Sequence, residues 1–390
     1  MKNQLYIFNP WHDMALANFT PYYRIPSEIV RMNNDLSFLP VWYAPENAYV
    51  KISDINIIDT FNSQISSFVR FNPERFVDKC FNCDVIPWGW NPALVSSLST
   101  EGVDTLPDRS KLDRIRYLSG RQRCVDVLSS FSAVNGICGQ AFCCYTIDDV
   151  KSNLLTNGNM ILKAPWSGSG RGLCRVSLST WSTNIEGWVS RILRTQGCIM
   201  AEPLYNKTCD FAMEFYSSSD GNVSFAGYSL FDTDVFGNYK QNILMSDSKI
   251  ESHLLSYGIS VHLLHYVRER LTDILSNLID GDYCGYFGVD MMLCLQEGVV
   301  LLHPCVEINM RMNMGVVSRV IFNRYLSSSS QGNFIIEHYN SEGDALLSHQ
   351  KMLSLHPVVI DSSGRISSGY LTLTPVLSTT RYQAYLIVKE

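Results

Sequence analysis

A pair of strand-like runs separated by a two-residue turn constrains the fold of this chain more than any other pattern. Residues 285–296 and 299–311 read as two strands, and Glu297 with Gly298 lies between them. Two residues of this kind between two apolar runs favour a tight β-hairpin. We therefore predict a hairpin that closes at Glu297 and Gly298.

Four polar side chains fall on one face of this predicted hairpin. Because side chains alternate along a strand, Glu307, Asn309 and Arg311 share a face. Closure at the turn places Asp290 opposite Cys305 and diagonal to Glu307, on that same face. An acid on one strand then faces an acid, an amide and a guanidinium on the next.

This set of side chains indicates a metal-bound phosphate site. Two carboxylates and one amide offer hard oxygen ligands, which suit Mg²⁺, and Mg²⁺ keeps its other positions for waters and phosphate oxygens. The alternative interpretation is a hairpin whose polar face is only solvated.

Length and composition exclude several classes of protein. At 390 residues the chain can form two or three domains, and 46% hydrophobic with 17% charged residues is typical of a globular protein. The net charge of −6 gives no general reason to expect nucleic acid as a partner. No apolar stretch approaches the ~20 residues that cross a bilayer, so we expect no membrane partner and a cytoplasmic location.

The twelve cysteines do not indicate a disulfide scaffold in a chain of this size, and they fit a reducing compartment. Cys80 and Cys83 have the spacing of a zinc or redox pair. No second pair follows at ligand distance, so a metal or redox role for them is the weaker interpretation.

The first hundred residues alternate apolar runs with helical patterns, which predicts an open α/β layer. Residues 3–8 read as its first strand. Ligands collect where the strands of such layers end, so Asn9, His12 and Asp13 are candidates for holding a substrate. Alternatively, Asn9 begins a turn and Asp13 caps a helix that starts at Met14.

A second domain is predicted to begin near residue 106. Residues 111–129 carry apolar side chains at helical spacing, with Arg121 among them. Further on, Lys163 ends a strand, residues 167–172 form a glycine-rich loop, and a second strand follows without a helix. Dinucleotide and P-loop sites run from the loop into a helix, so this loop matches neither. Its backbone could still approach phosphate oxygens, or it could be only a flexible turn.

The next motif is an apolar strand that ends at Glu202, followed by an irregular link through Leu204 and a second strand near Asp210. Free backbone groups in such a link can read an adenine edge. Equally, the two acids could be a strand-end charge and a turn former. Residues 236–242 could approach an acceptor, and Lys240 is the candidate there.

Taken in order, these motifs resemble the ATP-grasp superfamily. The resemblance covers about residues 105–325 and is most specific at the hairpin. It implies a nucleotide held between two α+β subdomains, with an α/β domain in front that contributes to the acceptor site. The implied parts are an N-terminal α/β domain, a small subdomain with the lid, a large subdomain with the metal site, and a β-rich extension: 1–105, 106–200, 201–330 and 331–390.

The resemblance assigns roles around the nucleotide. Lys163 would bind the α- and β-phosphates and take part in catalysis, and Arg121 would replace the more usual second lysine. This exchange is not neutral, because a planar guanidinium and a point charge bind phosphates differently. The other implied contacts are with the phosphates as a lid (Ser167, Gly168, Ser169, Gly170 and Gly172), the adenine (Glu202 and Leu204), the ribose (Asp210) and the underside of the purine (Met292).

The resemblance also assigns the metal and the chemistry. Asp290, Glu307 and Asn309 would hold one or two Mg²⁺ ions, with Mn²⁺ as an alternative, and Arg311 would stabilise the transferring phosphoryl group. The implied activity is an ATP-dependent ligase that activates a small-molecule carboxylate as an acyl phosphate for attack by an amine. Two alternatives remain open: a kinase-like phosphotransferase on the same scaffold, and a nucleotide-binding regulator without turnover.

Residues 331–390 lie outside the resemblance. Their alternating runs predict strands that cover the front or the central sheet. Dimers are common in the superfamily, so a homodimer is an option.

Overall fold

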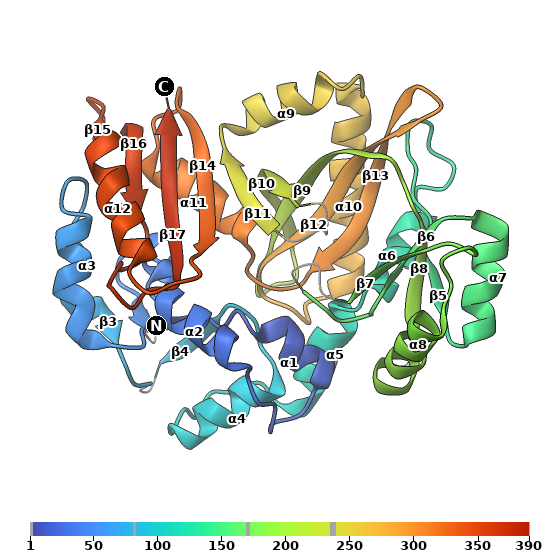
Figure 1. The fold of residues 1–390 in the computed structure, drawn as a ribbon, viewed down its shortest axis with the longest axis horizontal. Helices are drawn as coiled ribbons and strands as arrows, with labels where there is room; N and C mark the ends of the chain where they lie inside the picture. The colour runs from blue at the N-terminus through green and yellow to red at the C-terminus, as the bar shows by residue number, and fades with distance from the viewer. Residues whose placement is uncertain (1–2, 81–82, 169–171, 235–238, 390) are drawn as a thin grey trace.

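The computed structural model describes residues 3–80, 83–168, 172–234 and 239–389. Their strands form three sheets, of four, nine and four strands (Figure 1). Within these residues, no helix has the length and apolar character that a membrane span requires.

The first sheet is parallel, as the open α/β layer requires, in the order β3-β2-β1-β4. Its strands are β1 (Gln4–Ile7), β2 (Tyr49–Lys51), β3 (Phe76–Val77) and β4 (Asp84–Pro87). Its helices are α1 (His12–Asn18), α2 (Ser27–Leu36), α3 (Ile58–Gln64) and α4 (Pro92–Thr100), with short 3-10 turns η1 (Leu39–Trp42), η2 (Ile55–Ile57) and η3 (Pro73–Arg75).

Two helices connect this layer to the second sheet. They are α5 (Arg109–Leu118), which Asp108 caps, and α6 (Gln122–Ser129). The helical pattern predicted over residues 111–129 is confirmed, but it is divided between two helices. The chain turns between the two helices, and the Arg121 backbone N–H donates to the Pro165 carbonyl at 3.2 Å instead of continuing a helical ladder.

The second sheet is antiparallel, in the order β5-β8-β6-β7. Its strands are β5 (Phe142–Cys144), β6 (Met160–Lys163), β7 (Leu173–Val176) and β8 (Ile199–Pro203), and it packs with α7 (Ile147–Asn157) and α8 (Thr183–Gln196). This unit lies at the right of Figure 1. The predicted passage from strand to strand without a helix is confirmed, because β6 and β7 pair directly.

The third sheet has the order β13-β12-β9-β10-β11-β14-β17-β16-β15. Its strands are β9 (Lys207–Ser217), β10 (Val223–Thr233), β11 (Tyr239–Leu244), β12 (Gly285–Gln296), β13 (Val299–Asn309), β14 (Gln331–His338), β15 (Val359–Ile360), β16 (Ile366–Thr372) and β17 (Tyr382–Lys389). Its helices are α9 (Asp247–Leu255), α10 (Val261–Ile279), α11 (Met314–Tyr325) and α12 (Asp344–Leu355). The strands after residue 331 extend this sheet edge to edge rather than cover a sheet.

One apolar core joins the first layer to these C-terminal strands. Trp42 is fully buried in it, and its indole N–H donates to the Leu373 carbonyl at 2.7 Å. The core also contains the buried face of α11 and Leu386 of β17. Residues far apart in the chain therefore share one interior.

The hairpin closes where the sequence predicts, but its register differs. Gln296 pairs with Val299, and Glu297 and Gly298 both adopt positive φ, at 49° and 82°, as a tight hairpin turn requires. Further along, a bulge shifts the register, so that Asp290 lies opposite Glu307 and not opposite Cys305.

The bulge lies in β13. Met292 pairs with His303, while Asp290 pairs with Glu307, so β13 uses two more residues than β12 over this stretch. Pro304 lies within it and has no N–H to donate to the ladder. The bulge brings the two acids directly opposite each other.

Candidate functional site

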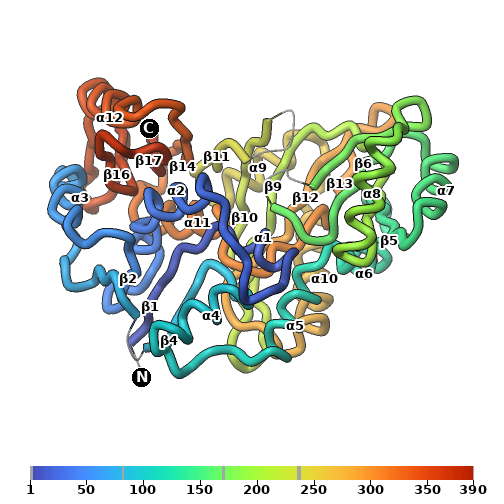
Figure 2. The backbone as a smooth tube through the Cα atoms, turned by 60° about the horizontal axis from the view of Figure 1, so that its bottom comes forward, coloured from blue at the N-terminus to red at the C-terminus, as the bar shows by residue number. Residues whose placement is uncertain are grey.

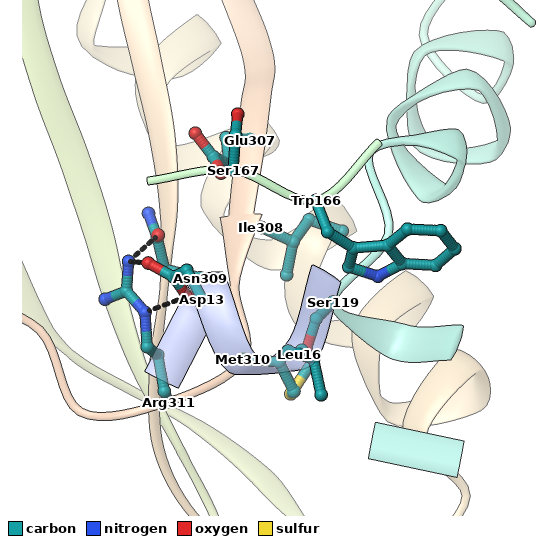
Figure 3. Close-up of a pocket in the computed structure, with 10 residues that line it drawn as sticks. All are labelled: Asp13, Leu16, Ser119, Trp166, Ser167, Glu307, Ile308, Asn309, Met310 and Arg311. Carbon is teal, nitrogen blue, oxygen red and sulfur yellow. Dashed lines mark hydrogen bonds and ion pairs between the residues drawn. The ribbon is translucent and has the colours of Figure 1, made fainter. Parts of the chain in front are cut away.

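The four polar residues of the hairpin lie where it meets α1 and the start of the β6–β7 loop. Asp13, Ser167, Glu307, Asn309 and Arg311 all line a small cavity there (Figure 3). Figure 2 shows α1 passing close to the strands of the third sheet. The site is thus assembled from parts of the chain that are distant in sequence.

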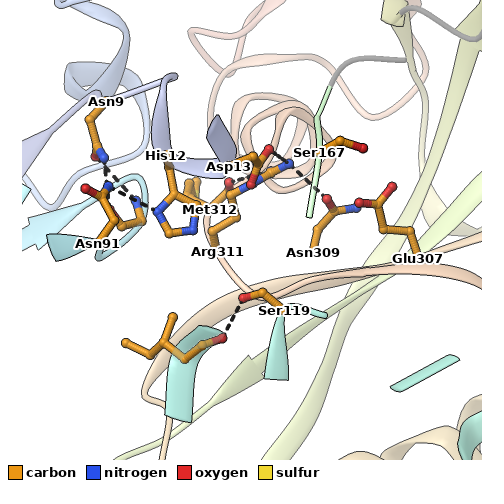
Figure 4. A network of polar contacts seen from close by, with 12 residues as sticks. Asn9, His12, Asp13, Asn91, Ser119, Ser167, Glu307, Asn309, Arg311 and Met312 are labelled. Carbon is orange, nitrogen blue, oxygen red and sulfur yellow. Dashed lines mark hydrogen bonds and ion pairs between the residues drawn. The ribbon is translucent and has the colours of Figure 1, made fainter. Parts of the chain in front are cut away.

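Arg311 is held by three partners, one of which is the Met312 carbonyl, which accepts from Nη1 at 3.2 Å. Arg311 Nε and Nη2 donate to the two carboxylate oxygens of Asp13, both at 2.7 Å, and Nη2 also donates to Asn309 Oδ1 at 2.9 Å (Figures 3 and 4). Burial lowers the pKa of Arg311, but the charge and hydrogen bonds of Asp13, together with the charges of Glu307 and Asp290, raise it above its usual value. Burial raises the pKa of Asp13, and the charge and hydrogen bonds of Arg311 hold it below its usual value. Both groups are therefore ionised.

Asp13 does not cap α1. Trp11 occupies the N-cap position, and Asp13 lies in the first turn with its carboxylate directed to Arg311. The alternative that Asp13 is a helix cap is therefore wrong. The carboxylate instead ties α1 to the end of the hairpin.

Arg121 connects three segments. One Nη donates to the Ala164 carbonyl and to Ser167 Oγ, both at 2.7 Å, and the other donates to Glu307 Oε2 at 2.7 Å. Burial lowers the pKa of Arg121, but the charge and hydrogen bond of Glu307 raise it. The guanidinium is a buried, permanent positive charge beside the glycine loop.

Lys163 is the second buried cation. Its ammonium lies 2.6 Å from Glu202 Oε2, and both side chains are almost fully buried. Sequence reasoning missed His303 nearby, whose two ring nitrogens are buried without a hydrogen-bond partner. Burial and then the charge of Lys163 lower the pKa of His303 to about 3, so the imidazole is neutral. The sequence held a signal for His303, because a hairpin that closes at Glu297 and Gly298 places it opposite Met292.

Three carboxyl groups crowd the hairpin face. Burial, followed by the charges of Glu307 and Glu214, raises the pKa of Asp290 to about 8. Glu214, on β9, was also missed, and burial raises its pKa to about 7. A single acid within the apolar run 211–215 was the available signal, because a charge in a central strand needs a reason. In the described ranges, no three His, Cys, Asp or Glu side chains form a metal-binding group.

Asn9 and His12 do not join this site. Both are 1% exposed. The Asn9 amide donates to the Gly89 carbonyl at 2.9 Å, and the His12 ring lies 3.5 Å from the Asn91 amide (Figure 4). Burial lowers the pKa of His12 to about 4. The two side chains hold the loop after β4 instead of facing the hairpin.

The expected adenine and ribose residues are placed as follows. The Leu204 backbone N–H donates to the Asn159 carbonyl at 2.9 Å. Asp210 accepts a hydrogen bond from Thr233 at 2.9 Å and is ion-paired with Lys207. Met292 pairs with Asp210 in the β9–β12 ladder. Lys240 is exposed on β11.

The glycine loop begins against the site. A Cβ added to Gly168 would lie 2.4 Å from Asp13 Oδ2. At the other end, Gly172 has a φ of 76° and its carbonyl accepts from the Ala164 N–H at 2.8 Å. Ser169 and Gly170 lie outside the described residues.

Comparisons with known proteins support the fold. No protein-family model matches the sequence, and no curated protein matches it. The chain is similar in structure to the biotin carboxylase domain of 2-oxoglutarate carboxylase from Hydrogenobacter thermophilus, solved with magnesium ADP, ADP and bicarbonate. The TM-score is 0.50 at 13% identity, over 78% of this chain and 70% of that chain.

Two further structures give similar values. Pyruvate carboxylase from Rhizobium etli has a TM-score of 0.50 at 10% identity, over 100% of this chain and 36% of that chain. N5-carboxyaminoimidazole synthetase from Staphylococcus aureus, complexed with ADP, has a TM-score of 0.49 at 10% identity, over 100% of this chain and 94% of that chain. At such identities the likeness concerns the fold alone.

Proposed function

Starting from the ATP-grasp fold of this chain, we propose that it is an ADP-forming ligase that binds ATP with Mg²⁺. It would activate a carboxylate as an acyl phosphate for attack by an amine. One observation carries the proposal: Asp290, Glu307 and Asn309 share a cavity wall with Arg311, and Arg121 is bonded to Glu307. Carboxylates that can bind a metal therefore lie next to guanidinium groups that can bind phosphates, and phosphoryl transfer requires both.

The metal set fits this chain. The pKa of Asp290 is raised because burial and neighbouring carboxylates disfavour its charge, and a divalent cation removes that penalty. Asp290, Glu307 and Asn309 would hold Mg²⁺, and Mn²⁺ suits the same oxygen ligands. When bound, the ion would neutralise charge on the transferring phosphoryl group.

The buried cations fit phosphate oxygens. Lys163 ends β6 and Arg121 precedes α6, so both charges adjoin the loop that opens at Ser167. They would bind the phosphates, and the loop would cover them. Arg311, fixed by Asp13, would stabilise the transferring group.

The adenine of the nucleotide would lie near the link that follows β8. Glu202 and Leu204 would contact the adenine, Met292 would pack beneath it, and Asp210 would approach the ribose. His303 lies on β13 opposite Met292, and its buried, neutral ring would border the adenine site.

The test is Mg·ATP turnover with hydroxylamine as a generic nucleophile and a panel of carboxylates, with ADP and hydroxamate scored separately. We expect hydroxamate with the correct carboxylate, and a loss of at least about 100-fold in Glu307→Gln. Glu269→Gln, the same change on an exposed face of α10, should retain activity.

Other outcomes assign other functions. Substrate-dependent ADP without hydroxamate would favour a kinase-like phosphotransferase. ATP binding that needs no metal and leads to no turnover would favour a regulator.

A further inference from the structure

A larger cavity continues from the hairpin toward the first layer and the C-terminal strands. Its volume is about 450 Å³, within the range of small-molecule sites. One end carries the polar residues described above. The other end is lined by apolar side chains from α1, α2, the loop after β4, α11 and β14: Met14, Ile29, Met32, Trp88, Met314 and Ile336. A metal and a triphosphate require polar walls, so they do not account for this apolar end.

Glu214 lines the same cavity and is 1% exposed. A Cβ on Gly288 would lie 2.4 Å from its Oε2, and a Cβ on Gly315 would lie 2.0 Å from its Oε1. Glycine at both positions therefore leaves room for the carboxyl group. The Ser229 hydroxyl borders the same space, 2.5 Å from a Cβ on Gly315.

No cation of the described residues lies within ion-pair distance of Glu214. Its carboxylate accepts a hydrogen bond from the Asn313 amide at 2.9 Å. The nearest positive groups are engaged elsewhere, because Arg311 pairs with Asp13 and Arg319 lies 3.4 Å from Asp247. A buried carboxylate without a cation is unfavourable, which is why burial raises its pKa to about 7. A cationic ligand group would relieve that cost.

The surroundings decide between the two substrates of a ligase. A carboxylate placed beside Glu214 would lie against a buried carboxyl group that has no cation of its own, so an anion is disfavoured there. An ammonium group is favoured at the same position. The apolar wall adds a preference for hydrocarbon, because removing apolar surface from water is favourable.

We propose that this cavity binds the amine substrate: a primary amine whose ammonium group contacts Glu214 and whose aliphatic or aromatic group packs against the apolar wall. The inference rests on the proposed ligase function, and it names the chemical class of the nucleophile. Glu214 is then a specificity-determining residue.

The first test uses the unmodified protein with Mg·ADP and measures binding by calorimetry. The probes are 2-phenylethylamine, the neutral 2-phenylethanol and the polar ethanolamine. 2-Phenylethylamine should bind at least about tenfold more tightly than either of the others, since it alone has both an ammonium group and an apolar ring. Equal affinities, or no binding of 2-phenylethylamine, would overturn the proposal.

Two variants separate the contributions. Glu214→Gln should remove the preference for the amine over the alcohol, whereas Glu269→Gln should keep it. Met32→Asp should remove the preference for 2-phenylethylamine over ethanolamine and does not depend on the fold tolerating a change at Glu214. If Glu214→Gln instead weakens Mg²⁺ binding and leaves amine binding unchanged, Glu214 belongs to the metal site and the proposal fails.

The binding assay needs no turnover, so the two proposals can fail separately. Hydroxamate formation without any amine preference would support the ligase function and contradict the amine site. An amine preference without hydroxamate from any carboxylate would support the amine site and contradict the ligase function.

Discussion

At the scale of single residues, Asp290 gives the site a pH dependence. Its pKa is raised to about 8 in the folded protein, so folded Asp290 holds its proton more tightly than in the unfolded chain. The stabilisation is complete below the unfolded pKa, near 4, and is lost as the pH rises through the folded pKa. The metal-free protein should therefore become less stable between about pH 4 and pH 8.

The measurement is the free energy of unfolding in urea with EDTA at pH 5 and pH 8. Asp290→Asn, which cannot ionise, should show a decrease smaller by roughly 2 kcal/mol, a value discounted because the residue is only half-buried. Asp59→Asn, on the exposed side of α3, should retain the full decrease. Equal slopes in all three proteins would contradict the assigned pKa.

Residue identities at the hairpin could be predicted, but their partners could not. Alternation along one strand is enough to group Glu307, Asn309 and Arg311. The ion pair with Asp13 joins residues that no local pattern connects, and Glu214 reaches the site only through the pairing of β9 with β12. Asn9 and His12 show the converse, because strand-end position alone does not show which way a side chain faces.

At the scale of elements, two helical glycines should respond in opposite ways to alanine. Gly315 lies in α11, where a Cβ would meet Glu214 and Ser229, so Gly315→Ala should lower the free energy of unfolding by about 1–3 kcal/mol. Gly187 lies in α8 with no atom near its added Cβ, so Gly187→Ala should raise it by about 0.5–1 kcal/mol.

Urea unfolding of both variants checks this prediction. If Gly315→Ala were as stabilising as Gly187→Ala, the Glu214 carboxyl group would not lie as close to Gly315 as described. The Gly187 variant thus serves as the matched control for the backbone effect of the same substitution.

The helices and strands could be predicted from the sequence, but the positions where they are interrupted could not. The turn at Glu297 and Gly298 has a local signal, and so does the helix that Ser260 caps. The break before Arg121 depends on a hydrogen bond to Pro165, and the β13 bulge depends on a partner strand. Both are decided by tertiary contacts rather than by spacing.

At the scale of the whole molecule, the first layer and the C-terminal strands should unfold together. Leu386 of β17 is fully buried in the core that contains Trp42. Leu386→Ala should therefore cost about 2–5 kcal/mol, while Leu347→Ala, 67% exposed on α12, should change stability by less than about 0.5 kcal/mol.

The measurement follows both regions of the molecule during urea unfolding. Tryptophan fluorescence, to which Trp42 contributes, and far-UV circular dichroism should shift to the same lower midpoint in Leu386→Ala. A separate early transition in one signal would show that the two regions unfold independently.

Motifs mark the parts of the chain before residue 331, whereas residues 331–390 carry no motif of their own. The continuity of the nine-stranded sheet could not be predicted, since β11 and β14 pair although three helices and the hairpin lie between them in the chain. Strand pairing across such distances leaves no periodic signal in the sequence.

The bond between Arg311 and Asp13 has a consequence for the synthesis of this protein. The two residues are 298 positions apart in the chain. At about 5–20 residues per second, a ribosome needs roughly 15–60 s to deliver the second after the first. During that interval Asp13 lacks its hydrogen-bond donor, Arg311. A nascent chain therefore cannot assemble the site, even if its first layer has already folded. Under the proposed function, incomplete chains would therefore not turn over ATP at this site.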